Sequence, residues 1–134
     1  MGEEALGVFY YPVEVGDPSG TRFERVEALV DTGASYSAFP ASQLRRLGVT
    51  PHDRRRFRIG SGLSVEFDLG RTWIRLDGKA EVVLVLFGDE GLGSVLGAHS
   101  LEAFSLGVDP IAKRLIPVEG LFLPFPSGAE ELRR

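Results

Sequence analysis

The sequence predicts an all-β fold, a closed barrel of short strands with one or two short helices. Three observations predict it: apolar and polar residues alternate along much of the chain, turn residues separate the alternating segments, and only two short segments have helix-forming composition. A chain of 134 residues has the length of one domain. Because no repeat or linker is visible, we expect one domain over residues 1–134, with its core at about 8–118 and a tail at 119–134.

The first half of the chain is predicted to contain two strands and a short helix. Apolar residues at every second position of 9–15 indicate a half-buried strand, and the Gly-Asp-Pro-Ser-Gly of 16–20 indicates a turn. Residues 21–30 are again extended and end in an apolar Ala-Leu-Val run, which is typical of a strand that enters the core. Residues 41–48 combine helix formers with a final glycine, so we expect one or two helical turns there.

The second half is predicted to contain two hairpins followed by short elements. Residues 56–67 alternate on both sides of Gly60-Ser61-Gly62, which predicts a hairpin with a flexible tip. A second hairpin is expected at 71–87, because Asp77-Gly78 is a strong two-residue turn signal. Its apolar part, Val82–Phe87, is typical of a strand covered on both faces. The remaining expectations are a strand at 94–96, a helix at 98–104, a break at 107–110 and a strand at 114–118.

The composition excludes several kinds of chemistry. Hydrophobic residues make up 43% and charged residues 25%, as in folded globular proteins rather than disordered ones. The chain has no cysteine and only two histidines, His52 and His99, both expected at the surface. It therefore offers no thiolate nucleophile and no cysteine- or histidine-rich metal site, and we expect neither a metal nor a cofactor. Catalysis would have to come from carboxylates, hydroxyls or the backbone.

The net charge and the distribution of charged residues indicate which kinds of partner the protein can bind. A net charge of −4 argues against a general nucleic-acid binder. The longest apolar run, Val82–Phe87, is far shorter than the roughly 20 residues of a membrane helix, and Met1–Glu4 is acidic, so we expect no membrane partner and a cytoplasmic protein. Six arginines form either a solvated face or a patch for an acidic partner: Arg45, Arg46, Arg54, Arg55, Arg56 and Arg58.

The most informative segment is Asp31-Thr32-Gly33-Ala34-Ser35, directly after the apolar run of the second strand. A carboxylate at the end of a buried strand costs several kcal/mol unless it is hydrogen-bonded. The next two residues offer a hydroxyl and a freely approachable backbone N–H. Two interpretations are open: a functional carboxylate, or an aspartate that starts an Asx-turn, which is common at strand ends.

Further segments, in the same order along the chain, carry a family resemblance. The residues Ala28 to Ala34 look like an active-site motif, Gly60-Ser61-Gly62-Leu63 lies at the place of a glycine-rich flap, and Val95-Leu96-Gly97 with the following helix is similar to a late Ile-Ile-Gly segment. Together they resemble the retroviral-type aspartic proteases, the retropepsin family. Val108-Asp109-Pro110 and Leu115-Ile116-Pro117 are similar to segments of its bacterial and archaeal members, so the resemblance spans about residues 8–118.

Two positions depart from the retroviral pattern. Retroviral members usually carry an acidic residue after Asp-Thr-Gly-Ala and an arginine after the late glycine, and these two side chains pair. Here the positions hold Ser35 and Ala98. Because both partners are absent together, no unpaired buried charge is left. The family's use of that acidic side chain to recognise substrate backbone is therefore not carried over.

The resemblance implies a retropepsin-like barrel with a flap and a homodimeric aspartic endopeptidase that acts on peptides or unfolded protein. It implies Asp31 as the catalytic residue, Thr32 as a cross-brace between the two copies, and Gly33 as a backbone contact to substrate. Since the chemistry needs two carboxylates that share a proton, and the chain has one Asp-Thr-Gly, the second copy of Asp31 must come from another chain. The expected substrate-binding residues are Thr32, Gly33, Ala34 and Ser35, with Gly60, Ser61, Gly62 and Leu63 of the flap.

Other interpretations remain open at this stage. A retropepsin-fold dimer could bind peptides or a partner protein without cleavage, since a fold does not fix a function. The arginines could serve an adaptor for acidic partners. The apolar segment 121–126 either joins a dimer interface or docks on its own domain. Trp73, expected on the outward face of its strand, either serves a contact surface or packs at an edge.

Overall fold

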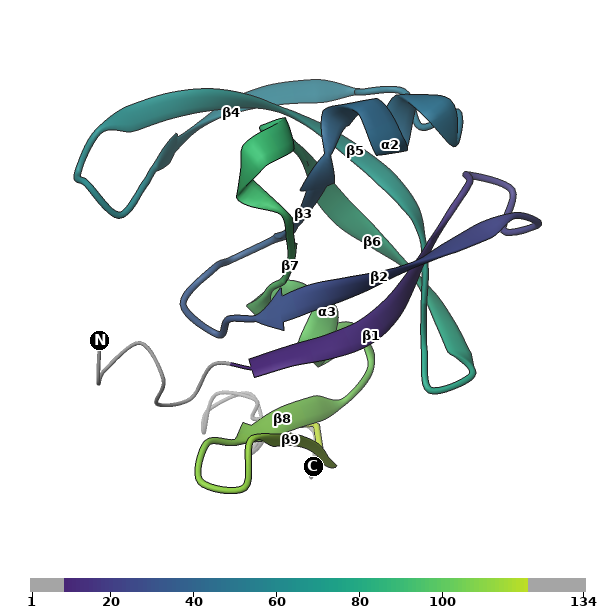
Figure 1. The fold of residues 1–134 in the computed structure, drawn as a ribbon, viewed down its shortest axis with the longest axis vertical. Coiled ribbons are helices and arrows are strands. Elements are labelled where there is room, and N and C mark those ends of the chain that lie inside the picture. Colours follow the sequence, from purple (N-terminus) through teal and green to yellow (C-terminus); the bar gives the residue numbers. More distant parts are fainter. Residues whose placement is uncertain (1–8, 121–134) are drawn as a thin grey trace, which may run out of the picture.

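The structure, a computed structural model, describes residues 9–120 (Figure 1). Its strands are β1 (Phe9–Gly16), β2 (Phe23–Val30), β3 (Ser37–Pro40), β4 (Asp53–Arg58), β5 (Ser64–Leu76), β6 (Lys79–Gly88), β7 (Ser94–Leu96), β8 (Leu106–Asp109) and β9 (Arg114–Pro117). Its helices are α2 (Ala41–Arg46) and α3 (Ala98–Ala103), with a single 3-10 turn, η1 (Glu90–Leu92). The predicted all-β class with two short helices is confirmed.

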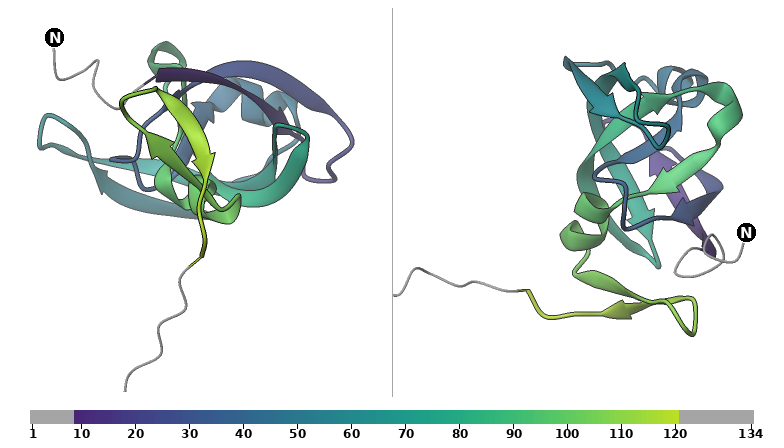
Figure 2. Two further views of the ribbon diagram at one scale, coloured as in Figure 1. Left: turned by 90° about the horizontal axis from the view of Figure 1, so that it is seen from below. Right: turned by 90° about the vertical axis from the view of Figure 1, so that its left-hand side faces the viewer.

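Six strands close into a barrel. The hydrogen-bonded order is β1-β2-β7-β3-β6-β5, and β5 returns to pair with β1 through Glu14 opposite Arg75 and Val15 opposite Ile74. The pairs β2–β7 and β3–β6 are parallel, whereas β1–β2 and β5–β6 are antiparallel hairpins. β8 and β9 form a separate two-stranded sheet beside the barrel, visible in both views of Figure 2. The predicted closed barrel is therefore confirmed.

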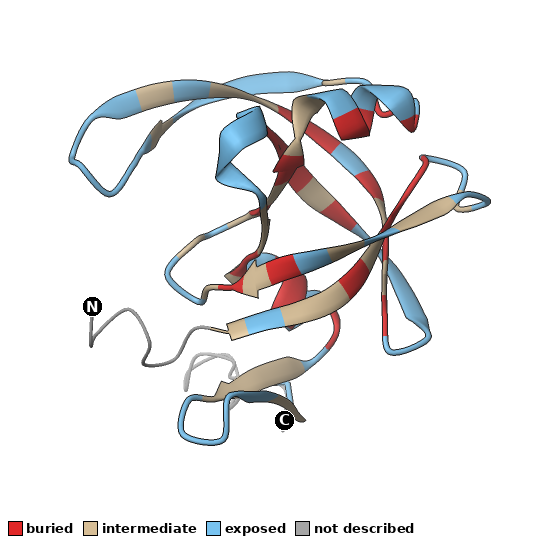
Figure 3. Ribbon diagram, in the orientation of Figure 1, coloured by how far each residue is buried: buried red, intermediate tan, exposed pale blue. Residues whose placement is uncertain are grey.

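The alternation of β1 places its apolar side chains in the barrel interior. Val13 and Val15 are fully buried there, and Val30 at the end of β2 joins them. The buried stretches of β1 and β2 are red in Figure 3. Phe39 and Leu96 complete the same core from β3 and β7. Burying side chains of this size removes about 1.5–3 kcal/mol of unfavourable hydration each. The core thus holds β2, β3 and β7 together at the point where β2 ends and Asp31 begins.

The two predicted hairpins share one strand. β5 runs without a break from Ser64 to Leu76, pairing with β4 along its first half and with β6 along its second. The turn at Asp77-Gly78 is confirmed, and both residues have positive φ, 52° and 82°, as this tight turn requires. Within the continuous strand, Gly70 leaves room for the Phe87 ring. A Cβ at position 70 would lie only 3.1 Å from that ring.

Two expectations about the later strands need correction, and one early strand was not predicted. Val82 is exposed and Leu84 is half-buried, so the segment Val82–Phe87 is covered on both faces only at its end. The predicted break at 107–110 is in fact mostly strand β8, and β3 was not predicted. Both missed strands have only four residues, too few for alternation to identify them.

Trp73 packs against the turn between β1 and β2. Its side chain is half-buried, and its indole lies against Gly20, where a Cβ would come within 3.0 Å of the ring. Gly20 also has a φ of +73°, which favours glycine. The packed interpretation of Trp73 is supported.

Three sequence expectations concern the end of the chain, the membrane and metal binding. The tail prediction for 121–126 lies outside the described residues. Between residues 9 and 120, the two helices have six residues each, and neither is long and apolar enough to cross a bilayer. In the same range, His, Asp and Glu side chains form no cluster of three that could hold a metal ion.

Asp17 anchors the turn between β1 and β2. Its buried carboxylate accepts the N–H groups of Thr21 and Arg22 at 2.8 and 3.0 Å, and the hydroxyls of Ser19 and Thr21 at 2.9 and 3.0 Å. The Arg22 N–H, followed by the Thr21 and Ser19 donors, holds the pKa of Asp17 far below its usual value despite the opposing effect of burial. The charged carboxylate thus stabilises the turn.

We expect Asp17→Asn to lower the melting temperature by several degrees at neutral pH, because an amide accepts these bonds less well. A carboxyl whose pKa is depressed by folding stabilises the protein above its unfolded pKa, about 4, and loses that contribution as the pH falls towards the folded pKa. The gap between wild type and variant should therefore narrow below about pH 4 in thermal unfolding scans. Asp89→Asn is the control, and a gap that is constant with pH contradicts the assignment.

Candidate active site

Asp31 begins the loop that leaves the barrel at the end of β2. Its backbone N–H donates to the carbonyl oxygen of Leu96 in β7 at 3.0 Å, and its side chain is half-buried. Oδ1 accepts the Gly33 N–H at 2.9 Å, and the Ala34 N–H donates to the Asp31 carbonyl at 3.1 Å. The bond to Gly33 is the Asx-turn contact. It also fixes the carboxylate orientation, so the turn and a functional role are compatible.

The hydroxyl of Thr32 does not stabilise the Asp31 carboxylate. Thr32 is exposed, and its hydroxyl has no hydrogen-bond partner among residues 9–120. The backbone N–H of Gly33 alone supplies the stabilising bond that the sequence led us to expect from both residues.

Residues 97–100 fasten the Asp31 loop (residues 31–36) to the barrel. Three N–H groups make the contacts: Ala98 to the Ala34 carbonyl (2.8 Å), His99 to the Ser35 carbonyl (2.9 Å) and Gly97 to the Ser37 hydroxyl oxygen (3.0 Å). The buried Ser37 and Ser100 hydroxyls lie 2.6 Å apart. Gly97 approaches so closely that a Cβ would lie 2.6 Å from the Tyr36 carbonyl. The loop is thus held rigidly against α3.

We expect Ser37→Ala to lower the free energy of unfolding by about 1–3 kcal/mol, because the buried Gly97 N–H and Ser100 hydroxyl lose their partner. Urea denaturation measures the change. Ser64→Ala, at an exposed serine of β5, is the matched control and should stay within about 0.5 kcal/mol of wild type. Equal effects of the two substitutions would contradict the role of Ser37 in holding Gly97 and Ser100.

A groove lies between the Asp31 loop and the hairpin of β4 and β5. We call residues 53–68 the flap hairpin; it projects from the barrel on the same side as the Asp31 loop (Figures 1 and 2). The groove has a volume of about 230 Å³. Its lining comes from both sides: Gly33, Ala34, Ser35, Tyr36, Ala38, Phe57, Arg58, Ile59, Phe67, Leu86 and Val95.

The groove contains only part of the predicted binding set. Gly33, Ala34 and Ser35 line it, whereas Thr32 and the flap tip from Gly60 to Leu63 do not. The tip is exposed and held by its own turn, in which Gly62 donates to the Ile59 carbonyl at 2.8 Å with a φ of +90°. In a single chain the tip therefore extends past the groove into solvent, and substrate binding by residues 60–63 stays a prediction.

Several groove residues were not predicted. Tyr36 lies directly after the recognised motif, and Phe57 and Phe67 lie on one face of the flap hairpin. The period-two alternation of 56–67 carried the signal for this face. What the alternation could not show is that this face turns toward the Asp31 loop.

Residues 11–109 match the family model described as aspartyl protease. The chain belongs to the aspartyl protease family. No curated protein sequence matches it significantly. Its fold is similar to that of the simian foamy virus protease, with 17% identity, a TM-score of 0.51, and coverage of 70% of this chain and 92% of the viral one.

Two cellular proteins share the fold of this aspartyl protease chain. The retroviral protease-like domain of Ddi1 from Leishmania major has 20% identity and a TM-score of 0.51, over 90% of this chain and 98% of that domain. The Legionella pneumophila protein Lpg0085, of unknown function, has 16% identity and a TM-score of 0.50, over 82% of this chain and 93% of that protein. The predicted retropepsin-like fold is confirmed.

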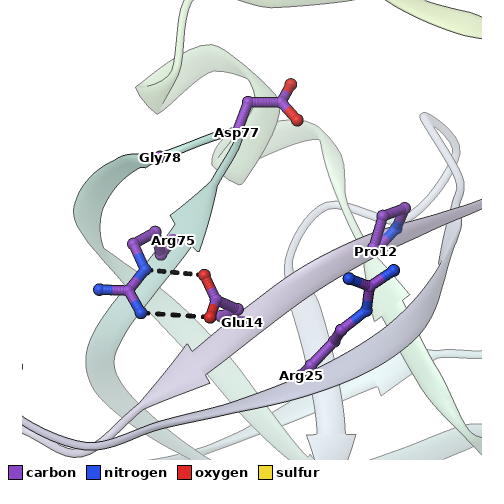
Figure 4. A pocket seen from close by; sticks show the side chains of 6 residues that line it. All are labelled: Pro12, Glu14, Arg25, Arg75, Asp77 and Gly78. Atoms are coloured by element: carbon purple, nitrogen blue, oxygen red, sulfur yellow. Dashed lines mark hydrogen bonds and ion pairs between the residues drawn. The ribbon is translucent and has the colours of Figure 1, made fainter.

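A second hollow lies at the other end of β2 from Asp31, where β1 meets β5 (Figure 4). There the Arg75 guanidinium donates to both Glu14 oxygens, at 2.7 and 3.1 Å, and this ion pair holds the pKa of Glu14 below its usual value. Arg75 also lies over the Phe23 ring, 3.9 Å from its centroid. These contacts stabilise the junction of β1 and β5. Because Arg75 and Glu14 already pair with each other, neither is a free charge for binding a ligand.

The arginines of 45–58 are mostly paired with neighbouring carboxylates. The ion pairs are Arg45–Asp68 (3.3 Å), Arg46–Glu24 (2.8 Å), Arg54–Glu66 (3.0 Å), Arg54–Asp68 (2.8 Å), Arg55–Asp53 (2.8 Å) and Arg56–Glu66 (3.3 Å). Arg58 donates to the Gly62 carbonyl. Exposed pairs of this kind contribute at most about 1 kcal/mol each. The solvated-face interpretation is favoured over the adaptor.

Proposed function

We propose that the protein is a homodimeric aspartic endopeptidase. The observation that carries the proposal is the position of Asp31, half-buried and oriented by the Gly33 N–H, in the loop that forms one wall of the groove. Two Asp31 carboxylates from two chains would lie side by side and share one proton. The ionised one accepts a proton from the attacking water, and the protonated one donates to the carbonyl oxygen of the scissile bond.

The second copy supplies what one chain lacks. The chain has a single Asp-Thr-Gly, so a two-fold axis beside Asp31 is needed to complete the pair. The exposed hydroxyl of Thr32 is available for the cross-brace between the two copies. In the dimer, the flap tip of residues 60–63 would close over the bound peptide.

The groove supports an extended peptide as substrate. The backbone of Gly33 contacts the peptide, and the lining residues Ala38, Leu86 and Val95 accept an apolar side chain near the scissile bond. Closure of the flap excludes water from the reacting atoms. We further propose that the enzyme works at acidic to mildly acidic pH, where a shared proton is retained, and that it is cytoplasmic.

Purified protein incubated with an unfolded protein between about pH 3 and about pH 7 tests the proposal, with and without a statine-type inhibitor. We expect cleavage that the inhibitor suppresses and that is absent from Asp31→Asn. Peptide binding without such cleavage would instead identify a non-catalytic dimer. Sedimentation tests the dimer separately, since a monomer at high concentration leaves Asp31 without its partner.

A further inference from the structure

Four aromatic rings connect the flap hairpin to α3. Phe67 and Phe57 lie with centroids 6.1 Å apart at 61°, Phe57 and Tyr36 5.8 Å apart at 88°, and Tyr36 and His99 4.8 Å apart at 72°. All three contacts have the edge-to-face geometry that aromatic rings prefer. We call this row the aromatic ladder. Tyr36, one of its two central members, belongs to the Asp31 loop and contacts Phe57 of the flap hairpin.

The flap hairpin has two different faces. The outer face carries the paired arginines and carboxylates: Arg54, Arg56, Glu66 and Asp68. The inner face carries Phe57 and Phe67, which line the groove together with Tyr36. Arg55, also on the inner face, donates to the Tyr36 hydroxyl at 3.4 Å. The ring and the hydroxyl of Tyr36 therefore both contact the flap hairpin.

Tyr36 is held in place by packing against Gly97, whereas β4 pairs with a single strand. Gly97 packs against the Tyr36 carbonyl, and the buried Ser37 follows in the chain. In contrast, β4 forms ladder hydrogen bonds with β5 only and lies outside the closed barrel. β5 continues from the flap hairpin into the barrel, so the angle of the hairpin over the groove depends on β5 and on side-chain contacts. Among these contacts, Phe57 on Tyr36 joins the hairpin directly to the Asp31 loop.

We propose that Tyr36 is a positioning residue that docks the flap hairpin over the groove through Phe57. The proposal rests on the proposed function for its catalytic meaning, since a docked flap would hold the peptide against Asp31. Opening of the flap separates the Tyr36 and Phe57 rings, and closure brings them together again. Tyr36 itself exchanges no proton with the substrate.

Hydrogen–deuterium exchange of the ligand-free protein tests the docking without any need for cleavage. In Tyr36→Ala, we expect amides of the flap hairpin to exchange about three- to tenfold faster, with β1 and β6 unchanged. Tyr36→Phe retains the ring and loses only the long 3.4 Å bond from Arg55, so its exchange should be much closer to wild type than to Tyr36→Ala. Phe57→Ala should match Tyr36→Ala, and the double variant should exchange no faster than either. Tyr10→Ala, at an exposed tyrosine of β1, is the control.

Three results would overturn the proposal: unchanged flap exchange in Tyr36→Ala, faster exchange throughout the barrel, which indicates only a structural role, or a Tyr36→Phe variant that behaves like Tyr36→Ala. If the protein cleaves peptides, Tyr36→Ala should raise KM more than it lowers kcat, and Tyr36→Phe should restore KM. A protein that cleaves nothing but shows the expected exchange pattern refutes the proposed function and leaves the docking intact.

Discussion

Replacement of Asp31 by asparagine is expected to abolish peptide hydrolysis while leaving the fold intact. The amide oxygen can still accept the Gly33 N–H, so the turn after β2 is retained. An amide cannot take a proton from water or share one with its copy, so turnover should fall by about three orders of magnitude or more. Initial rates on an unfolded protein measure the loss, and thermal unfolding measures the retained stability.

Asp77→Asn is the matched control for this substitution. Asp77 lies in the turn between β5 and β6 with a φ of 52°, a conformation that asparagine tolerates. Its carboxylate accepts the Tyr11 hydroxyl at 2.8 and 2.9 Å, far along the chain from the Asp31 loop. Turnover should be close to wild type. Wild-type hydrolysis by Asp31→Asn, or equal losses in both variants, would show that Asp31 is not the reacting carboxylate.

Gly97→Ala is expected to have the next largest effect, on both stability and turnover. Its backbone has φ −99° and ψ −179°, which any residue adopts, so conformation is not the obstacle. The obstacle is space: a Cβ would lie 2.6 Å from the Tyr36 carbonyl and 2.9 Å from the Ala34 oxygen, both backbone atoms. Relieving these clashes costs about 1–3 kcal/mol of unfolding free energy.

The displaced backbone belongs to the Asp31 loop, so Gly97→Ala should also lower turnover, by about a hundredfold. Urea denaturation and initial rates measure the two effects. Gly91→Ala is the control, because a Cβ at Gly91 meets nothing within 4 Å. A Gly97→Ala protein with wild-type stability and turnover would show that the contact between residue 97 and the loop is not needed.

The strands with strong alternation were predictable from local sequence. The alternation in β1 and β2 and the Asp77-Gly78 turn depend on neighbouring residues only, and all were predicted correctly. β3 was not, because its four residues pair in parallel with β6 and touch β7 at Ala38 opposite Val95. These partners lie about fifty residues away in sequence, and no local pattern reveals such pairing.

The site was predictable to a similar extent. The Asp-Thr-Gly after an apolar strand located Asp31, since a carboxylate at that place needs hydrogen bonds. Tyr36 and Phe57 were missed because their contact forms only after the flap hairpin folds over the Asp31 loop. The arginines suggested a charged patch, whereas the carboxylates of Glu66 and Asp68 that pair with them come from the opposite strand.

The most direct test of the paired-carboxylate claim is a mixing experiment. Wild-type protein and Asp31→Asn are unfolded, combined in equal amounts and refolded together, and the initial rate is compared with that of wild type alone at the same total concentration. If each site needs one Asp31 from each chain, only wild-type pairs are active, and about a quarter of the rate should remain. A remaining rate of about half would mean that each chain acts alone, which contradicts the account.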